Sequence, residues 1–223
     1  MGEIRIDDYT AKEAMELAIK YMKLESVQTI EIVTLDTLKY YNDKEKYDTY
    51  DNIKWKQEAF NIVLAEDSAV LKSAGIDEER LLDERLLKEA DSYLFVKMFM
   101  RFLHKNRAKV FLLAENESVL KQMKSFIEIY SSGIKIIDSV IYDAENVSDD
   151  MILNRINGAE IDCVMATLSP PYQQEFVIKN RLLVNARIWI GLGTHLGRRS
   201  KKGFVYSKVI QIWNRYIKRK TMI

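Results

Sequence analysis

Cysteine, histidine and proline are scarce in this chain, and long apolar runs are missing. Its 223 residues include one cysteine, two histidines and two prolines. A single cysteine excludes an internal disulfide, and two distant histidines give no metal-ligand cluster, so we expect no metal site. No apolar run reaches the roughly 18 residues that a transmembrane helix needs. The start of the chain is acidic and lacks the features of a signal peptide. We therefore expect a cytoplasmic protein.

The rest of the composition is that of a globular protein with a sizeable core. Hydrophobic residues make up 48% of the chain and charged residues 30%. This composition is typical of a globular protein and excludes an intrinsically disordered one. Cys163 lies in an apolar segment, and we interpret it as a small core residue rather than a nucleophile. His104 lies in a helical run with Phe99 and Leu103, which indicates a structural role.

Positive charge is concentrated at the end of the chain. Residues 198–223 hold nine lysines and arginines and no acid, although the whole chain has a net charge of only +1. Subtracting +9 from +1 leaves −8 on residues 1–197. An acidic body with a basic tail indicates a polyanionic partner, such as a membrane surface, a nucleic acid or a phosphorylated substrate.

Apolar, β-branched segments recur along the chain and predict six strands. Several are almost uninterrupted apolar runs, which is typical of strands that are covered on both faces in a parallel sheet. Helix-length segments lie between them, in the pattern of βαβ units. The predicted strands are residues 29–35, 61–66, 109–114, 134–141, 161–167 and 187–193. The predicted helices are residues 11–25, 85–105, 116–131, 148–158 and 171–184.

This alternation predicts an α/β fold that is Rossmann-like, with a mostly parallel sheet of about six strands and helices on both faces. The first helix has a marked start, because Thr10 can cap it and Glu13 is the matching capping-box residue. We expect one compact domain, residues 1–197, followed by a basic C-terminal appendage, residues 198–223.

Both prolines, Pro170 and Pro171, follow the strand predicted at residues 161–167. Each proline fixes its own φ and disfavours helix at the residue before it, so the pair ends the strand. Gln173 and Gln174 then fall in the first turn of the next helix, at the carboxyl end of a parallel strand, where such sheets bind ligands. Their amides suit a sugar, a uracil edge or a phosphate. The alternative is that the prolines only end the strand and the glutamines are solvated.

The segment IDCVMATLSPPYQQEFVIKNRLLVNARIWIGLG, residues 161–193, resembles the hallmark segment of the WecG/TagA/CpsF glycosyltransferases. Pro171, Tyr172, Gln173 and Gln174 stand where that family has Pro-Lys-Gln-Glu. Three earlier segments are also similar to family motifs. They are IEIVTLDTLKYYND (Val-Thr-Leu-Asn), NIVLAEDSAVLKSAGI (Leu-Pro-Asp-Gly) and KVFLLAEN (the strand before a Gly-Gly turn).

The resemblance implies an inverting transferase that moves an N-acetylhexosamine, often N-acetylmannosamine, from a UDP-sugar to a polyprenyl-diphosphate-linked acceptor. Its products would feed teichoic acids, capsules and other surface polysaccharides, and no cofactor is implied. Asp67 stands at the family's aspartate, which implies a general base for the acceptor hydroxyl. Arg215 is the best match to a family arginine and suits the departing diphosphate. Thr34 and Asp36 would lie at the donor site.

Several of these residues also have a structural explanation. Asp67 can be a helix N-cap after the strand at residues 61–66, and Asp36 can cap similarly, because Asp is a preferred cap residue. His195 follows the last predicted strand and could contact a phosphate or act as an acid, but a lone histidine in a loop is more often a bystander.

The chain also departs from the family pattern. Ser68 stands at the glycine of Asp-Gly, and Ala114 and Glu115 stand at the Gly-Gly turn. The loss of these two glycines removes close backbone approach and puts a carboxylate where an anionic donor can lie. These changes favour a second hypothesis, a degenerate homologue without catalysis that acts as a partner subunit or binds a glycan.

The basic appendage indicates a peripheral contact with the inner face of the cell membrane. Apolar side chains share one face of a predicted helix with basic residues around it, which is typical of a helix at an anionic bilayer surface. The alternative is a helix docked on the body or on another subunit, and the resemblance implies a homo-oligomer. No nucleic-acid-binding module is recognisable, so we expect no nucleic acid partner. The apolar residues of this face are Val205, Val209, Ile212, Trp213 and Tyr216.

Overall fold

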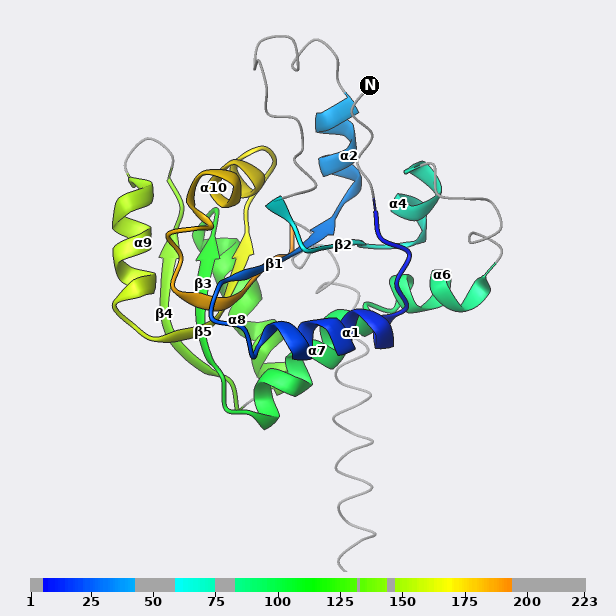
Figure 1. The fold of residues 1–223 in the computed structure, drawn as a ribbon. Helices are drawn as coiled ribbons and strands as arrows, with labels where there is room; N and C mark the ends of the chain where they lie inside the picture. Colours follow the sequence, from blue (N-terminus) through cyan, green and yellow to red (C-terminus); the bar gives the residue numbers. More distant parts are fainter. Residues whose placement is uncertain (1–5, 43–58, 75–82, 132, 144–146, 194–223) are drawn as a thin grey trace, which may run out of the picture.

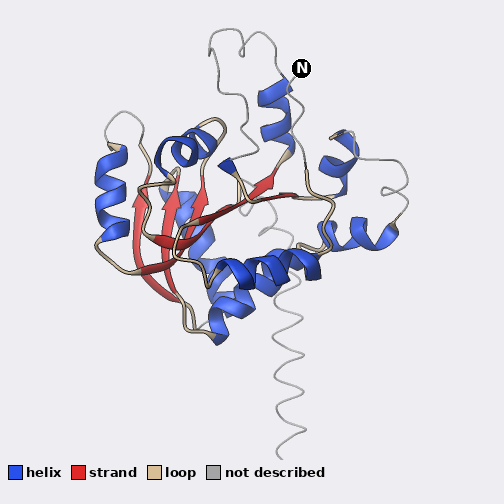
Figure 2. Ribbon diagram, in the orientation of Figure 1, coloured by secondary structure: helices blue, strands red, loops and turns tan. Residues whose placement is uncertain are grey.

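A six-stranded sheet forms the centre of the protein (Figures 1 and 2). The computed structural model describes residues 6–42, 59–74, 83–131, 133–143 and 147–193. The strand order is β2-β1-β6-β5-β3-β4, and every neighbouring pair is parallel. The predicted Rossmann-like α/β fold is therefore confirmed. The strands are β1 (Gln28–Val33), β2 (Ile62–Ala65), β3 (Lys109–Ala114), β4 (Lys135–Ile141), β5 (Ile161–Thr167) and β6 (Ala186–Gly191).

Helices cover both faces of this sheet, as predicted (Figure 1). α1, α7 and α8 pack on one face, whereas α2, α4, α9 and α10 pack on the other. α6 lies beside α4 and α7. The helices are α1 (Ala11–Tyr21), α2 (Leu35–Asn42), α4 (Ser68–Ser73), α6 (Glu84–Asp91), α7 (Leu94–Lys105), α8 (Glu117–Ser131), α9 (Asp149–Asn157) and α10 (Tyr172–Asn180).

The strand β5 shows how one apolar run serves two cores. Successive side chains of a strand point to opposite faces of the sheet. Cys163 and Met165 therefore join the core under α1, α7 and α8, while Val164 and Ala166 join the core under α9 and α10. The prediction that Cys163 is a core residue is confirmed, and burial raises the pKa of its thiol far above the ordinary value.

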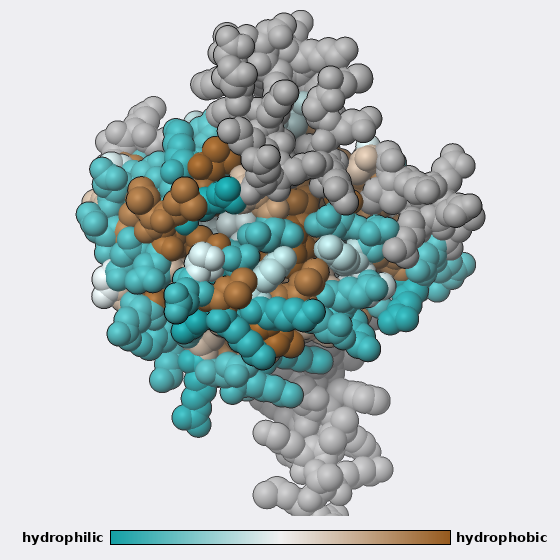
Figure 3. All heavy atoms as spheres, viewed as in Figure 1, coloured by the Kyte–Doolittle hydropathy of each residue, from teal (hydrophilic) through white to brown (hydrophobic). Residues whose placement is uncertain are grey.

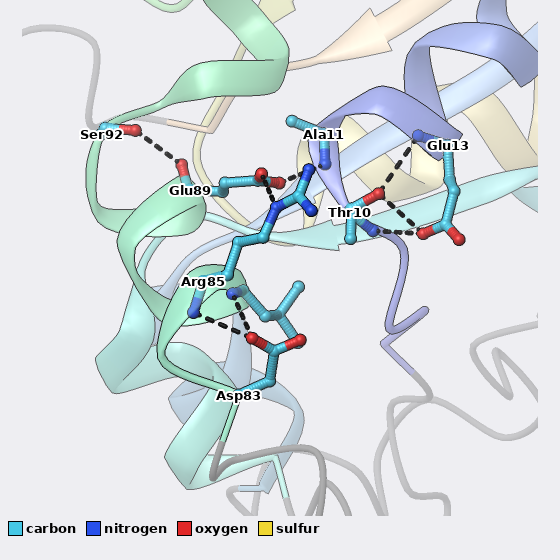
Figure 4. A network of polar contacts seen from close by, with 8 residues as sticks. Thr10, Ala11, Glu13, Asp83, Arg85, Glu89 and Ser92 are labelled. Atoms are coloured by element: carbon cyan, nitrogen blue, oxygen red, sulfur yellow. Dashed lines mark hydrogen bonds and ion pairs between the residues drawn. The ribbon is translucent and has the colours of Figure 1, made fainter.

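The start of α1 is held by carboxylates from two parts of the chain (Figure 4). Glu13 accepts hydrogen bonds from the backbone N–H and the hydroxyl of Thr10, each at 2.8 Å. The predicted capping box is therefore confirmed. Glu89 of α6 accepts from the Ala11 backbone N–H at 2.8 Å. This bond ties the start of α1 to α6, and Asp83 in turn caps the start of α6.

The structure corrects two boundaries at the start and the middle of the chain. The sequence predicts one helix at residues 85–105, and this is wrong, because α6 and α7 are separate helices. Tyr93 between them has a φ of 58°, in the left-handed region that an α-helix cannot use. The strand predicted at residues 29–35 ends earlier, at Val33, because Thr34 leads directly into α2. This helix begins at Leu35, so Asp36 lies in its first turn, and the prediction that Asp36 can cap a helix is wrong.

The turn after α10 carries strongly exposed apolar side chains. The sequence predicts helix through residue 184, but α10 ends at Asn180. In the turn that follows, Leu182 is 89% exposed and Leu183 59%.

Most of the surface in Figure 3 is hydrophilic, with separate apolar groups on it. In the part of the chain that the structure describes, no helix combines the length and the apolar character needed to cross a bilayer.

Candidate functional site

The carboxyl ends of β1 and β2 lie side by side at one edge of the sheet. The strands pair as far as Val33 and Ala65, and the Glu66 backbone N–H donates to the Val33 carbonyl at 2.9 Å. Thr34 and Asp67 follow these strands, so they begin neighbouring loops. Because parallel sheets bind ligands outside the carboxyl ends of their strands, this edge is the candidate site.

Asp67 is the N-cap of α4 and is partly exposed. Its Oδ1 accepts from the backbone N–H groups of Ala69 and Val70, each at 3.1 Å. The capping explanation is therefore confirmed. The same two bonds fix the position of the carboxylate at the end of β2. A second carboxylate lies at this helix start, because the Ser68 backbone N–H donates to Asp91 Oδ1 of α6 at 2.9 Å.

Thr34 and Asp36 lie at the start of α2. Thr34 is buried, and its hydroxyl is 3.0 Å from the Thr37 hydroxyl and accepts from the Thr37 backbone N–H at 3.1 Å. The Asp36 side chain is 37% exposed, with Oδ1 3.9 Å from Lys39 Nζ. Thr34 therefore holds the start of the helix from inside, whereas Asp36 presents its carboxylate at the surface.

The end of β6 closes onto the end of β1. Gly193 has a φ of 59°, which favours glycine, and a Cβ at this position would lie 2.5 Å from Thr34 Cγ2. The close approach of these two residues brings the end of the segment 161–193 next to the segment that resembles Val-Thr-Leu-Asn.

Gln173 and Gln174 point into the protein and share one carboxylate oxygen. Both Nε2 atoms donate to Oε1 of Glu31 in β1, each at 2.7 Å. Gln173 Oε1 accepts from the Leu168 backbone N–H at 3.3 Å, and Gln174 Oε1 accepts from the Tyr41 hydroxyl of α2 at 3.4 Å. Both glutamines are buried in the first turn of α10. The predicted place in the helix is confirmed, and the alternative that they are solvated is wrong.

Glu31 is the buried carboxyl group at the centre of this cluster. It is 0% exposed, and burial raises the pKa of its carboxyl to about 8, although the hydrogen bonds from Gln173 and Gln174 act in the lowering direction. Oε2 has no hydrogen-bond partner among the residues that the structure describes. It lies over Gly191 of β6, where an added Cβ would overlap it.

The adjacent ends of β3 and β5 carry another carboxylate. β3 leads to α8 on one face of the sheet and β5 leads to α10 on the other, so the chain changes direction between them. Open α/β sheets bind ligands at such a switch point. Here Glu115 Oε2 accepts from the Ser169 backbone N–H at 3.1 Å and also from the Ser169 hydroxyl. The Glu115 backbone N–H donates to the Thr167 carbonyl at 3.1 Å.

The two prolines join β5 to α10. The Pro170–Pro171 peptide bond is cis, and α10 begins at the next residue, Tyr172. The predicted end of the strand at the prolines is confirmed. The Tyr172 ring is 5.9 Å from that of Tyr142, which follows β4. This aromatic pair lies beside the loop at the carboxyl end of the sheet.

Three residues considered in the sequence analysis are not part of the described site. His195 and Arg215 lie outside the described residues, as does the appendage at 198–223, so their roles stay predictions. His104 Nδ1 accepts from the Gly133 backbone N–H at 2.8 Å, in agreement with a structural role. No group of three or more His, Cys, Asp or Glu side chains is placed to hold a metal ion within the described ranges.

Glu31 is the site residue that the sequence analysis does not identify. A signal for it exists, because a carboxylate interrupts the apolar strand QTIEIV. A polar group in a strand buried on both faces needs an internal partner. The partner cannot be read from local sequence, since Gln173 lies 142 residues further along the chain.

One known protein family matches most of the chain. A model of the glycosyl transferase WecG/TagA/CpsF family matches residues 1–202. The chain belongs to this family. Comparison with curated proteins gives no match. Membership in the WecG/TagA/CpsF family supports a glycosyltransferase role in surface polysaccharide synthesis.

Proposed function

We propose that this WecG/TagA/CpsF family member is an inverting transferase that moves an N-acetylhexosamine from a UDP-sugar to a polyprenyl-diphosphate-linked acceptor. N-acetylmannosamine is the first sugar to test, and teichoic acid or a related surface polysaccharide is the expected product. The family match over residues 1–202 carries the proposal. It is supported by Asp67, which is retained at the carboxyl end of β2 beside β1.

In this mechanism Asp67 is the general base. It takes the proton of the acceptor hydroxyl as the hydroxyl oxygen attacks the anomeric carbon, and the bond from that carbon to UDP breaks on the opposite side. The configuration therefore inverts. Such a base must be held within hydrogen-bond reach of the hydroxyl. The N-cap bonds of Asp67 support this role because they fix the carboxylate at the loop edge.

The donor site in this mechanism lies at the carboxyl edge of the sheet, where α2 and α10 begin. The starts of α2 and α10 shape the pocket for the sugar and uridine. Basic groups stabilise the negative charge that develops on the diphosphate as UDP leaves. The residues proposed to contact the donor and its diphosphate are Asp36, His195 and Arg215. Thr34, Gln173 and Gln174 are buried, so they would shape the donor site from inside the protein.

Calorimetric titration with UDP tests the proposal. UDP and a UDP-N-acetylhexosamine should bind in the presence of EDTA and raise the melting temperature, because a ligand that binds only the folded state stabilises it. ADP is the matched control and should bind at least about 10-fold more weakly. Absence of a response to UDP and to every UDP-hexosamine would contradict the proposal.

A second function has its own support. Glu115 stands at the position of a family glycine, and it is bonded to Ser169 at the switch point between β3 and β5. A carboxylate there opposes the approach of a diphosphate. This observation favours a non-catalytic homologue that acts as a partner subunit or binds a glycan. Copurification of a second glycosyltransferase with a chain that does not bind UDP would support this alternative.

The membrane contact and the oligomer also remain proposals. The nine basic residues of 198–223 are expected to bring the protein to an anionic bilayer, where each contributes about 1 kcal/mol before screening. Cosedimentation with anionic liposomes should be strong at low salt and weaker at high salt. A chain that stays in the supernatant at low salt would remove the membrane role and favour a docked helix. Analytical ultracentrifugation tests the homo-oligomer.

A further inference from the structure

A chain of buried hydrogen bonds joins four elements around the candidate site. It begins at the Tyr41 hydroxyl of α2 and passes through Gln174 to Glu31 Oε1 in β1. From Glu31 it passes through Gln173 to the backbone N–H of Leu168, in the loop after β5. Glu31 is the central member, because the amides of both glutamines meet at one of its oxygens.

We infer that Glu31 is a positioning residue for the substrate site, whose carboxyl group holds Gln173 and Gln174 in place and, through Gln173, the loop 168–171. Glu31 acts through α10 and the loop and does not touch the substrate. The inference rests on the proposed function for the identity of the substrate, while the network itself does not depend on that function.

The surroundings of Glu31 favour the protonated form. The described partners in the network are uncharged at neutral pH: Tyr41 from α2, and Gln173 and Gln174 from α10. An ionised carboxylate that is fully buried without a cation is costly. Burial accordingly raises the pKa of the Glu31 carboxyl to about 8. Oε1 then accepts from both amides, and the proton lies on Oε2.

The neighbouring strand leaves room for this carboxyl group. Glu31 pairs with Gly191 of β6, and a Cβ at Gly191 would overlap Glu31 Oε2 and lie 2.5 Å from Gln173 Nε2. Gly191 is not among the described residues with positive φ, so this glycine provides space rather than an unusual backbone conformation. Glycine at 191 and glutamate at 31 are therefore complementary in shape.

The network reaches the edge of the sheet where the substrate is expected. Leu168 directly precedes Ser169, which is bonded to Glu115 at the end of β3. A shift of the loop 168–171 would therefore move the walls of the site. Catalysis is sensitive to such shifts, since a misplacement of about 1 Å costs on the order of 100-fold in rate.

Two substitutions of Glu31 separate a hydrogen-bonding role from a charged role. Glu31→Gln keeps the oxygen that accepts from both amides and cannot ionise, whereas Glu31→Ala removes the acceptor. Hydrogen exchange measured across residues 164–180 should be unchanged in Glu31→Gln and faster in Glu31→Ala. For UDP-sugar transfer, kcat/KM should stay within about 3-fold in Glu31→Gln and fall by about 10-fold or more in Glu31→Ala, mainly through KM, because two buried amides lose their acceptor.

Gly191→Ala gives an independent test that keeps the carboxyl group and displaces it. Gly191→Ala should increase hydrogen exchange across residues 164–180. If Glu31→Ala does not fold, this variant still tests whether the position of the Glu31 carboxyl group controls the segment. Two matched controls lie far from the network and should behave like the wild type. Gly158→Ala adds a methyl group at the helix end before β5, and Glu160→Gln makes the same chemical change on an exposed side chain.

Two results would overturn the inference. One is unchanged exchange across residues 164–180 in both Glu31→Ala and Gly191→Ala. The other is a Glu31→Gln variant as impaired as Glu31→Ala, which would mean that the charge is needed. If the wild type transfers no sugar, the proposed function fails, but the exchange measurements still decide the role of Glu31.

Discussion

Two glutamates near the carboxyl edge of the sheet differ in what they do for the site. Glu31 is fully buried inside β1 and binds the side-chain amides of α10. Glu115 is partly exposed in the loop after β3 and binds Ser169 at the switch point. The first supports the half of the edge that retains family-like residues, and the second occupies the half where the family has glycines. The contrast separates a buried carboxyl group that holds α10 in place from a partly exposed carboxylate at the switch point.

The pH dependence of stability should separate the two glutamates most clearly. Burial raises the pKa of the Glu31 carboxyl from 4.5 to about 8. Between these values the folded protein holds a proton that the unfolded chain releases. The contribution of the Glu31 proton to the free energy of unfolding is therefore complete below about pH 4.5. It is lost as pH rises to about 8, and the free energy of unfolding falls by at most about 1.4 kcal/mol per pH unit.

Urea unfolding at several pH values from about 5 to 8 measures this effect. Glu31→Gln should remove the decline, so its free energy of unfolding should rise relative to the wild type as pH increases. Glu115→Gln should leave the decline in place. Parallel curves for wild type and Glu31→Gln would mean that Glu31 does not hold a proton in this window.

Asp67→Asn should lower the transfer rate by about 100-fold or more, the usual scale for a general base. Stability should change little, because Asn is also a good N-cap residue. Asp83→Asn is the matched control: it makes the same change at the N-cap of α6 and should leave the rate near that of the wild type. Equal rates for Asp67→Asn and wild type would leave Asp67 with its capping role alone.

Gln173→Ala should weaken UDP-sugar binding by about 1 to 3 kcal/mol, the cost of an unmet polar partner. The loss arises because the substitution removes the hydrogen bonds from Gln173 to Glu31 and from the Leu168 backbone N–H, which hold the start of α10 and the loop before it. Calorimetry with the UDP-sugar measures it, and Gln122→Ala on α8 is the control. Unchanged affinity would return the Pro-Pro-Tyr-Gln-Gln stretch to a purely structural role.

Glu115→Gln should have the smallest effect and the opposite sign. It keeps an acceptor for Ser169 and removes a negative charge at the switch point, so UDP should bind about 3- to 10-fold more tightly at low salt. Glu117→Gln, in the first turn of α8, controls for the change in net charge. An affinity equal to that of the wild type would place the diphosphate away from β3 and β5.

Local signals in the sequence were sufficient for much of the fold. The continuous apolar run of β5 and the Thr10–Glu13 capping box are read from neighbouring residues, and the structure confirms both. The break between α6 and α7 could not be predicted, because Tyr93 has a left-handed conformation at a position where the sequence has no glycine to mark it.

The candidate site was only partly predictable, for a physical reason. Asp67, Gln173 and Gln174 were found because they match a family pattern and follow strands. What the glutamine amides bind depends on which strands become neighbours, and that is decided by the whole sheet. Glu31 therefore appears as their partner only once β1 lies beside β6 and α10 crosses over them.

The most direct test of the account is the transfer reaction itself. Full-length protein is incubated with a UDP-N-acetylhexosamine and vesicles that contain a polyprenyl-diphosphate-linked sugar, and mass spectrometry follows both UDP and the lipid-linked product. The account predicts one added N-acetylhexosamine per released UDP, lost in Asp67→Asn and kept in Asp83→Asn. Folded wild-type protein that forms no product with any UDP-hexosamine would contradict the account and leave the non-catalytic homologue as the better description.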